Sequence, residues 1–330
     1  MAKPPCVAYA LGVSSSTGIR MPSWLKDFEI KDKKIIVKAT GAELPLGLEV
    51  AKEVLSWFPF YLYEKARRLG HVFAGGERLK IAFSPVQPRP WYLISVLAYR
   101  AHMHRISDTS KADAVLYFED ETNPKPPLVP AKTLGKHFNF GCYDISKSRV
   151  AQKFEQIFGY ALAVDPLTYK GQIAVKSEKN GAHDGYTATA PLSKAQTANP
   201  DLVYQRLVDN SVDGKWAEDM RCPIIGGEIA LVFVKRRPLE SRFANINSGV
   251  ILRKPEDLLS DAERAKLKEF ATAMKLDFGG MDVLRDKSDG KIYVVDVNKT
   301  DMGPPIALSN ADKSKAVAML TKQLIRLIND

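Results

Sequence analysis

Oxygen-bearing side chains near the carboxyl-terminal end follow a pattern that suits a metal ion. Asp282 lies in one predicted strand, and Asp296 and Asn298 lie two residues apart in the next. Because side chains alternate between the faces of a strand, Asp296 and Asn298 share a face. Carboxylate and amide oxygens from neighbouring strands suit Mg²⁺, which phosphate groups often help to hold. We therefore predict a Mg²⁺ site here, with a solvated strand face as the alternative.

A second pattern, around Lys176, suits phosphate. Lys176 ends a predicted strand, and the loop after it contains Gly181, His183 and Gly185. Glycines let backbone N–H groups approach phosphate oxygens, and a lysine neutralises their charge. No Walker A sequence follows, and a lysine before a glycine loop is common. This segment alone therefore does not identify a site.

The order of these segments along the chain is more specific than any one of them. A lysine (Lys147) lies at the start of a predicted helix, before Lys176 and its loop. The strand 204–207 and the tripeptide Asp219-Met-Arg221 follow, and Gly226-Gly227 and the final carboxylates come last. In this order the segments resemble the ATP-grasp superfamily over about residues 145–305.

The resemblance implies a role for each matched residue. Lys147 and Lys176 would contact the nucleotide phosphates, and the loop 178–185, with His183, would close over them. Arg221 would stabilise the transferring phosphoryl group or an acylphosphate. The remaining implied ligands are Gln205 and Leu207 for adenine, Asp209 or Asp213 for the ribose, and Asp282, Asp296 and Asn298 for Mg²⁺, with Mn²⁺ as a substitute.

Two positions depart from the family pattern. Asp296 stands where many relatives carry Glu, so its shorter side chain shifts the metal or leaves a water in its place. Gln205 stands where an acidic residue is frequent, and its amide oxygen would then contact the adenine amino group.

A basic segment between Asp219-Met-Arg221 and the final carboxylates is a further candidate. It contains Arg237, Arg242 and Asn245, and it resembles the segment that peptide-forming members place beside the acylphosphate. On this interpretation Arg237 or Arg242 orients a carboxylate, and these residues join Arg221 as catalytic candidates. The alternative is a solvated run of charges.

Composition restricts the classes of protein without selecting one. The 330 residues include 48 Lys and Arg against 38 Asp and Glu, a net charge of +10. Hydrophobic residues make up 45% and charged residues 26%, which excludes global disorder. Three scattered cysteines exclude a disulfide scaffold and favour a reducing compartment. Nucleic acid, membrane, nucleotide and acidic substrates all remain open as partners of the positive charge.

The first half alternates strands and helices, which predicts a parallel α/β layer over 1–144. Strands are expected at 34–39, 79–83 and 112–118. Helices are expected at 48–69, where Pro59 would kink or divide the helix, and at 91–106.

The second half, 145–330, reads as an α+β, ATP-grasp-like fold in which two α+β subdomains clasp the nucleotide. Helices are expected at 146–158 and at 311–328. A third is expected from Ser260, which forms a capping box with Glu263, to about Met274. Strands are expected at 160–164, 173–176, 202–208, 220–225, 228–234, 281–284 and 292–297.

Location and partners follow less directly. No apolar run is long enough to cross a bilayer, and the amino terminus only faintly resembles a signal peptide, so we expect a cytoplasmic protein. The aromatic and basic segments 57–68 and 91–105 suit core packing first and peripheral membrane contact second. A homodimer agrees with the resemblance, and nothing indicates a specific nucleic acid.

The expected activity is ATP-dependent and Mg²⁺-dependent ligation. A carboxylate on a small or carrier-linked anionic substrate would be activated as an acylphosphate and attacked by an amine. The alternatives are a phosphotransferase acting on a sugar or lipid hydroxyl, and a nucleotide-binding protein without catalysis.

Overall fold

The computed structural model describes residues 28–32, 34–37, 42–45, 48–73, 78–130, 135–243 and 247–330. Its first sheet is antiparallel and contains β1 (Phe28–Lys31), β2 (Lys34–Val37) and β3 (Ala42–Pro45). The strand expected at 34–39 is therefore present as β2, but its place in a parallel layer was wrong. Short connections allow only antiparallel neighbours, since a parallel pair needs a long crossover.

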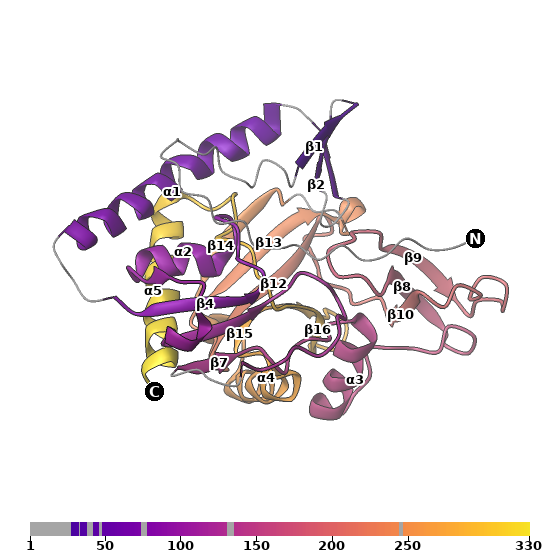
Figure 1. The fold of residues 1–330 in the computed structure, drawn as a ribbon. Coiled ribbons are helices and arrows are strands. Elements are labelled where there is room, and N and C mark those ends of the chain that lie inside the picture. Colours follow the sequence, from indigo (N-terminus) through magenta and orange to yellow (C-terminus); the bar gives the residue numbers. More distant parts are fainter. Residues whose placement is uncertain are drawn as a thin grey trace, which may run out of the picture.

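The parallel layer begins later in the chain, with the strand order β5-β4-β6-β7. Its strands are β4 (Lys80–Pro85), β5 (His104–Arg105), β6 (Ala114–Phe118) and β7 (Lys136–Phe138). The long helix α1 (Leu48–Phe73) packs on α2 (Leu93–Arg100), where the buried Glu64 pairs with Arg100 at 2.9 Å. Pro59 lies inside α1 without dividing it, and Figure 1 shows α1 along the side of the molecule opposite α4.

The helix expected over 91–106 was twice as long as the observed helix α2, which covers Leu93–Arg100. It ends at Arg100, because His102 adopts a left-handed backbone conformation with φ 57°. Met103 then donates its N–H back to Ala98 at 2.9 Å, and His104 donates to Leu79 at 2.8 Å. The residues after Arg100, whose spacing suggested two more helical turns, therefore lead into the pairing of β5 with β4 instead.

A small antiparallel sheet with the order β10-β8-β9 opens the second half. Its strands are β8 (Gly171–Ser177), β9 (Tyr186–Ala190) and β10 (Leu202–Arg206). Helix α3 (Lys147–Phe158) precedes it; Ser146 caps the helix, and Gly159 ends it at φ 80°. The strand expected at 160–164 was wrong, since only an isolated bridge between Ala163 and Gln205 forms there.

The largest sheet has the order β14-β13-β12-β15-β16, with β11 paired to β12. Its strands are β11 (Ser211–Val212), β12 (Trp216–Ile225), β13 (Val232–Pro238), β14 (Gly249–Arg253), β15 (Phe278–Arg285) and β16 (Ile292–Asn298). Gly226 and Gly227 both have positive φ at the predicted turn between β12 and β13. The capping box opens α4 (Asp261–Met274) as predicted, and α5 (Asn310–Asn329) ends the chain.

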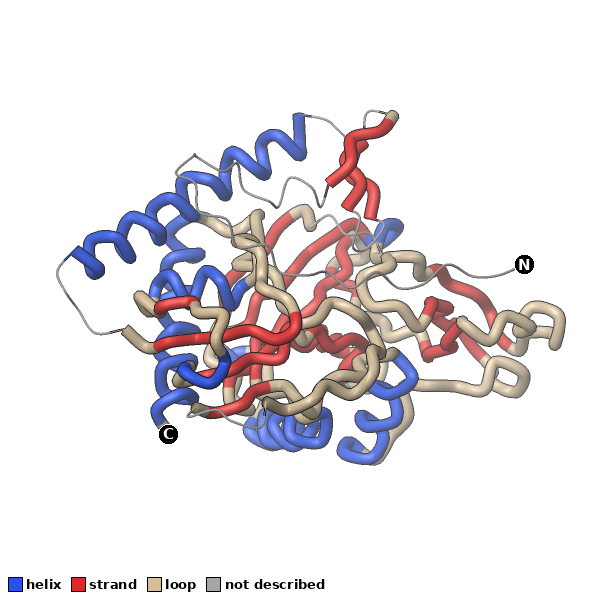
Figure 2. Tube along the Cα trace, viewed as in Figure 1, coloured by secondary structure: helices blue, strands red, loops and turns tan. Residues whose placement is uncertain are grey.

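Two hydrophobic clusters hold these layers together. One fills the space between the largest sheet and helices α3 and α4, with Phe154, Phe270 and Tyr293 fully buried. The other joins the parallel layer and α2 to α5, through residues such as Leu97, Phe233 and Leu320. Figure 2 shows the strands enclosed by helices on several sides. The division near residue 145 stays a prediction, because α5 shares its core with the first half.

Part of the aromatic segment expected in the core lies at the surface. Phe60 is buried, but Phe58, Leu62 and Tyr63 on α1 are about half exposed. Within the ranges described, no helix is both long and apolar enough to cross a membrane.

Asn139 joins the parallel layer to the largest sheet. It is fully buried at φ 64°; its side-chain oxygen accepts from the N–H groups of Asp277 and Phe278 at 2.9 Å each. Its amide nitrogen donates to the Phe278 carbonyl at 2.6 Å. These bonds satisfy backbone groups where β15 begins.

We expect Asn139→Ala to lower the free energy of unfolding by about 2–4 kcal/mol, because buried backbone groups lose their partners. Urea denaturation measures this loss. Asn139→Gly is the matched variant: it also removes the side chain but tolerates the left-handed backbone, and it should retain about 1 kcal/mol more stability than the alanine variant. Midpoints equal to that of the unaltered protein would contradict both expectations.

Candidate active site

The predicted phosphate and metal residues meet between the small sheet and the largest sheet. Asp296 on β16 is the central group, and burial raises the pKa of its carboxyl above the ordinary value. The positive charges of Lys147, at the start of α3, and of Lys176, on β8, act in the opposite direction. The Oδ1 atom of Asp296 is buried and has no hydrogen-bond partner. The sheets thus enclose a carboxylate oxygen available to a ligand.

The two lysines are held in place by the protein. Burial lowers the pKa of Lys176, while Asp296 favours its charged form. Its ammonium donates to Oε1 of Gln205 at 3.2 Å. Lys147 is 7% exposed and donates to the carbonyl of Lys179. Lys147 therefore touches the loop that the sequence predicted to cover phosphate.

Asp282, the first predicted metal ligand, is engaged by two cations. Its Oδ2 lies 2.8 Å from Nη1 of Arg221, and its Oδ1 lies 2.9 Å from Nζ of Lys235. Arg221 also contacts Oδ1 of the buried Asp301, at 2.6 Å from Nη2. Burial acts to raise the pKa of Asp282, but Arg221 and Lys235 outweigh it and hold that pKa well below the usual range. Each Asp282 oxygen is therefore already paired with one cation.

The three predicted metal ligands thus differ in availability. Asn298 lies against the Asn180 amide at 2.7 Å, and its oxygen can face Arg221, at 2.6 Å from Nη1. Of the three, Asp296 has the oxygen without a partner. The described part of the chain holds no group of three or more His, Cys, Asp or Glu side chains that could bind a metal ion. This donor set fits an Mg²⁺ ion held mainly by phosphate oxygens, with Asp296 as its protein ligand.

The loop 178–185 crosses the amino-terminal end of α3. The Glu178 carboxylate accepts from the Ser148 N–H at 3.1 Å and from its hydroxyl, and the Asn180 N–H donates to Oγ1 of Thr122 at 2.9 Å. Gly185 lies so close to Phe243 that a Cβ atom there would come within 2.8 Å of the ring. Gly181 and His183 both have positive φ, and burial lowers the pKa of His183, next to Arg237.

The residues expected to bind adenosine differ in their burial and in their hydrogen-bond partners. Gln205 is 1% exposed, and together with Lys147 it lines a cavity of about 220 Å³ between α3 and β10. The Lys176 ammonium donates to the amide oxygen of Gln205 at 3.2 Å, and the contact of that oxygen with adenine stays a prediction. The Leu207 N–H is paired with the Gln172 carbonyl at 3.0 Å. Asp209 is exposed and accepts from the Ser211 N–H at 3.2 Å, so its ribose contact stays a prediction.

The two arginines of the basic segment anchor the chain after β13. Arg237 is 2.8 Å from the Asp219 carboxylate and donates to Oδ1 of Asn247 and to the carbonyl of Arg242, both at 3.1 Å. Arg242 donates to the carbonyl of Val208 at 2.7 Å. Their contact with a substrate stays a prediction, and Asn245 lies outside the described residues.

Sequence reasoning missed two residues of the ion cluster. Lys235 belongs to the predicted basic run but was not singled out, although it reaches Asp282. Asp301 lies three residues beyond Asn298, outside any recognised spacing, and its contact with Arg221 depends on the fold. Cys142 and Cys222 are buried free thiols.

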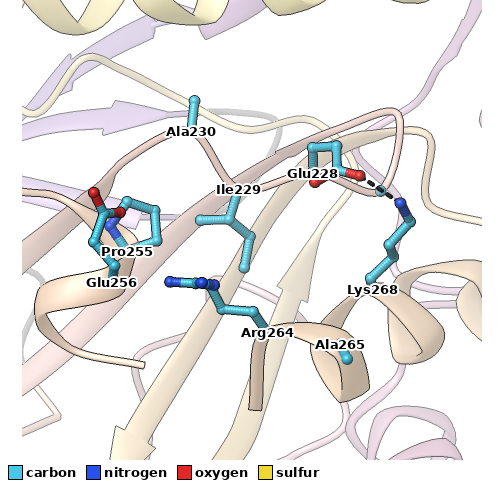
Figure 3. A pocket seen from close by; sticks show the side chains of 9 residues that line it. Glu228, Ile229, Ala230, Pro255, Glu256, Arg264, Ala265 and Lys268 are labelled. Atoms are coloured by element: carbon cyan, nitrogen blue, oxygen red, sulfur yellow. Dashed lines mark hydrogen bonds and ion pairs between the residues drawn. The ribbon is translucent and has the colours of Figure 1, made fainter. Parts of the chain in front are cut away.

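A second cavity, of about 380 Å³, lies beside the turn between β12 and β13 and against α4. Figure 3 shows Glu228 and Lys268 paired across its rim, with Arg264 pointing into the space below Ile229. None of the predicted site residues lines this cavity. The candidate active site is therefore the space between the two sheets.

Comparison with known proteins identifies the fold. No family model matches the chain, and no curated protein matches it. A solved structure of the ATP-grasp ligase PsnB with a minimal precursor is 14% identical and covers 76% of this chain and 99% of its own, with a TM-score of 0.50. PsnB with precursor peptide PsnA2 and AMPPNP is 13% identical, with coverage of 76% and 98% and a TM-score of 0.51.

A D-alanine–D-alanine ligase from Bacillus anthracis is 16% identical over 77% of this chain and 96% of its own, with a TM-score of 0.45. At these identities the PsnB structures inform on the fold alone. They confirm the resemblance predicted from the order of the sequence segments: this chain has an ATP-grasp-like fold.

Proposed function

We propose that this protein is an ATP-dependent and Mg²⁺-dependent ligase that joins a carboxylate to an amine. The observation that carries the proposal is the buried Oδ1 of Asp296, which has no hydrogen-bond partner and belongs to a carboxylate that the charges of Lys147 and Lys176 stabilise. Two cations and one available carboxylate oxygen suit a nucleoside triphosphate and its metal ion. The fold supports the same function, since the similar structures include an ATP-grasp ligase bound to a precursor peptide. We therefore propose a peptide or another carboxylate-bearing molecule as substrate.

The residues of this chain would divide the work between charge and position. Lys147 and Lys176 neutralise phosphate oxygens, and the loop 178–185 excludes water above them. Arg221, fixed by Asp282 and Asp301, presents a rigid cation where phosphoryl charge develops. Mg²⁺ held by Asp296 would withdraw further charge from the phosphates.

The proposed reaction has two balanced steps. A carboxylate oxygen of the substrate attacks the γ-phosphorus of ATP, the bond to the bridging oxygen breaks, and ADP leaves. The amine nitrogen then attacks the acyl carbon of the acylphosphate and loses a proton, and inorganic phosphate leaves. Such chemistry depends on positioning and charge stabilisation, which agrees with a site built from lysines, arginines and carboxylates.

We expect Asp296→Asn to lower turnover of Mg·ATP at least about 100-fold, the usual effect of losing one catalytic electrostatic group. Stability should hold or rise, because the variant removes a buried charge. Phosphate release and urea denaturation measure the two effects. Asp257→Asn, at an exposed ion pair with Arg253, is the control and should leave turnover unchanged. Full activity in the Asp296 variant would refute the metal assignment.

The reaction type has its own test. Incubating the protein with Mg·ATP and a panel of amino acids and peptides should release ADP and inorganic phosphate in equal amounts, because the phosphoryl group leaves the acylphosphate as phosphate. Coupled assays measure both products. ADP without free phosphate would instead indicate transfer to a hydroxyl. No turnover with any substrate would leave nucleotide binding alone.

A further inference from the structure

The long helix α1 carries an exposed apolar face in addition to the face that packs on the protein. Phe60 is buried in the core shared with α2 and α5, and Glu64, one turn further on, is also buried. By contrast, Phe58, Leu62 and Leu69 are 52%, 47% and 52% exposed. Because these three are four and seven residues apart, they form one stripe along the helix.

Basic side chains lie at both edges of this exposed face. An α-helix turns about 100° per residue, which places Lys65 at one edge and Arg67, beyond Tyr63, at the other. All three side chains are exposed, and Arg67 donates to the Tyr63 hydroxyl at 3.2 Å. The one acid within 58–71 is Glu64, which is paired at 2.9 Å with an arginine of α2. The exposed charges of this part of α1 are therefore all positive.

The apolar area of this face is small for a stable contact with another protein. An aromatic side chain buries about 150–250 Å² and leucine somewhat less, so half-exposed Phe58, Leu62, Tyr63 and Leu69 offer roughly 300–400 Å². A stable protein interface buries about 800 Å² on each partner. A symmetric pair of copies would also bring like charges together, because both edges of the face are basic. An anionic lipid surface requires neither a matching shape nor a minimum area.

We propose that α1 binds the surface of an anionic membrane and lies parallel to it. Phe58, Leu62 and Leu69 enter the boundary between headgroups and acyl chains. Lys65 and Arg67 extend their charged ends to the lipid phosphates on either side of the helix. Figure 1 shows α1 at the edge of the molecule, where a flat surface can reach it. This attachment is separate from the proposed ligase site, since none of these residues belongs to that site.

Flotation of the full chain with lipid vesicles tests the proposal without any nucleotide. Vesicles of phosphatidylcholine and phosphatidylglycerol in equal parts should bind the protein at least about tenfold more tightly than phosphatidylcholine alone. The reason is that each basic residue near an anionic surface strengthens binding about fivefold. High salt should remove most of this difference. Failure to bind the anionic vesicles, or equal binding to both kinds, would overturn the proposal.

Variants assign the binding to the exposed face of α1. Leu62→Gln combined with Leu69→Gln should weaken binding to the anionic vesicles about tenfold or more, because two apolar side chains no longer leave water. Leu128→Gln combined with Val129→Gln is the matched control, since these apolar residues are also exposed but lie outside α1. The control should bind like the unaltered protein. Unchanged binding by the α1 variant would show that another surface contacts the lipid and would overturn the assignment.

Two further measurements test the role of charge and the alternative of a second copy. Lys65→Glu combined with Arg67→Glu should abolish the preference for anionic vesicles, and thermal unfolding establishes that each variant is folded. Light scattering after size exclusion gives the mass of the protein in solution. A dimer that the Leu62 and Leu69 variant dissociates would show that another copy of the chain covers this face. That result would overturn the proposal.

Discussion

The centre of the structure depends on the ion pairs that the Arg221 guanidinium makes. From β12 it reaches Asp282 on β15 and Asp301 beyond β16, so one side chain ties three segments together. The approach is so close that a Cβ atom on Gly280 would come within 2.7 Å of Nε of Arg221 and 2.5 Å of an Asp301 oxygen. Only glycine fits this point of β15 without displacing the pair. The charge that would stabilise phosphoryl transfer is thus also part of the framework that positions it.

The elements of the second half could be predicted largely because each carries local signals. The capping box at Ser260, the terminal Gly159 of α3 and the paired glycines 226–227 act through their own backbone geometry. The first half was harder, because partners remote in sequence decided the outcome. His104 joins β4 where periodicity favoured more helix, and β2 joins an antiparallel sheet whose short strands give little pattern.

In the candidate site, too, local signals were predictable and contacts between residues remote in sequence were not. Alternation along β16 and the order of segments identified Asp296 and the lysines, since these depend on position along strands and helices. What each side chain contacts could not be read in advance. Lys235 competes for Asp282, Asp219 and Asn247 occupy Arg237, and Lys176 fixes the orientation of Gln205. Such choices follow from the distance and hydrogen-bonding capacity of neighbours that only the tertiary structure brings together.

The small sheet β10-β8-β9 has a hydrophobic cluster of its own, centred on Ile173 and Val175 and separate from the two larger cores. The parallel layer, by contrast, shares a core with α5 and is joined to β15 through Asn139. Rotating the small sheet would break polar contacts such as those of Lys147 and Glu178, and those of Arg206 with Asp286 and Tyr293. We therefore expect the three-stranded sheet to move as a rigid body relative to the rest of the molecule when the site opens. The polar contacts would stabilise the closed state.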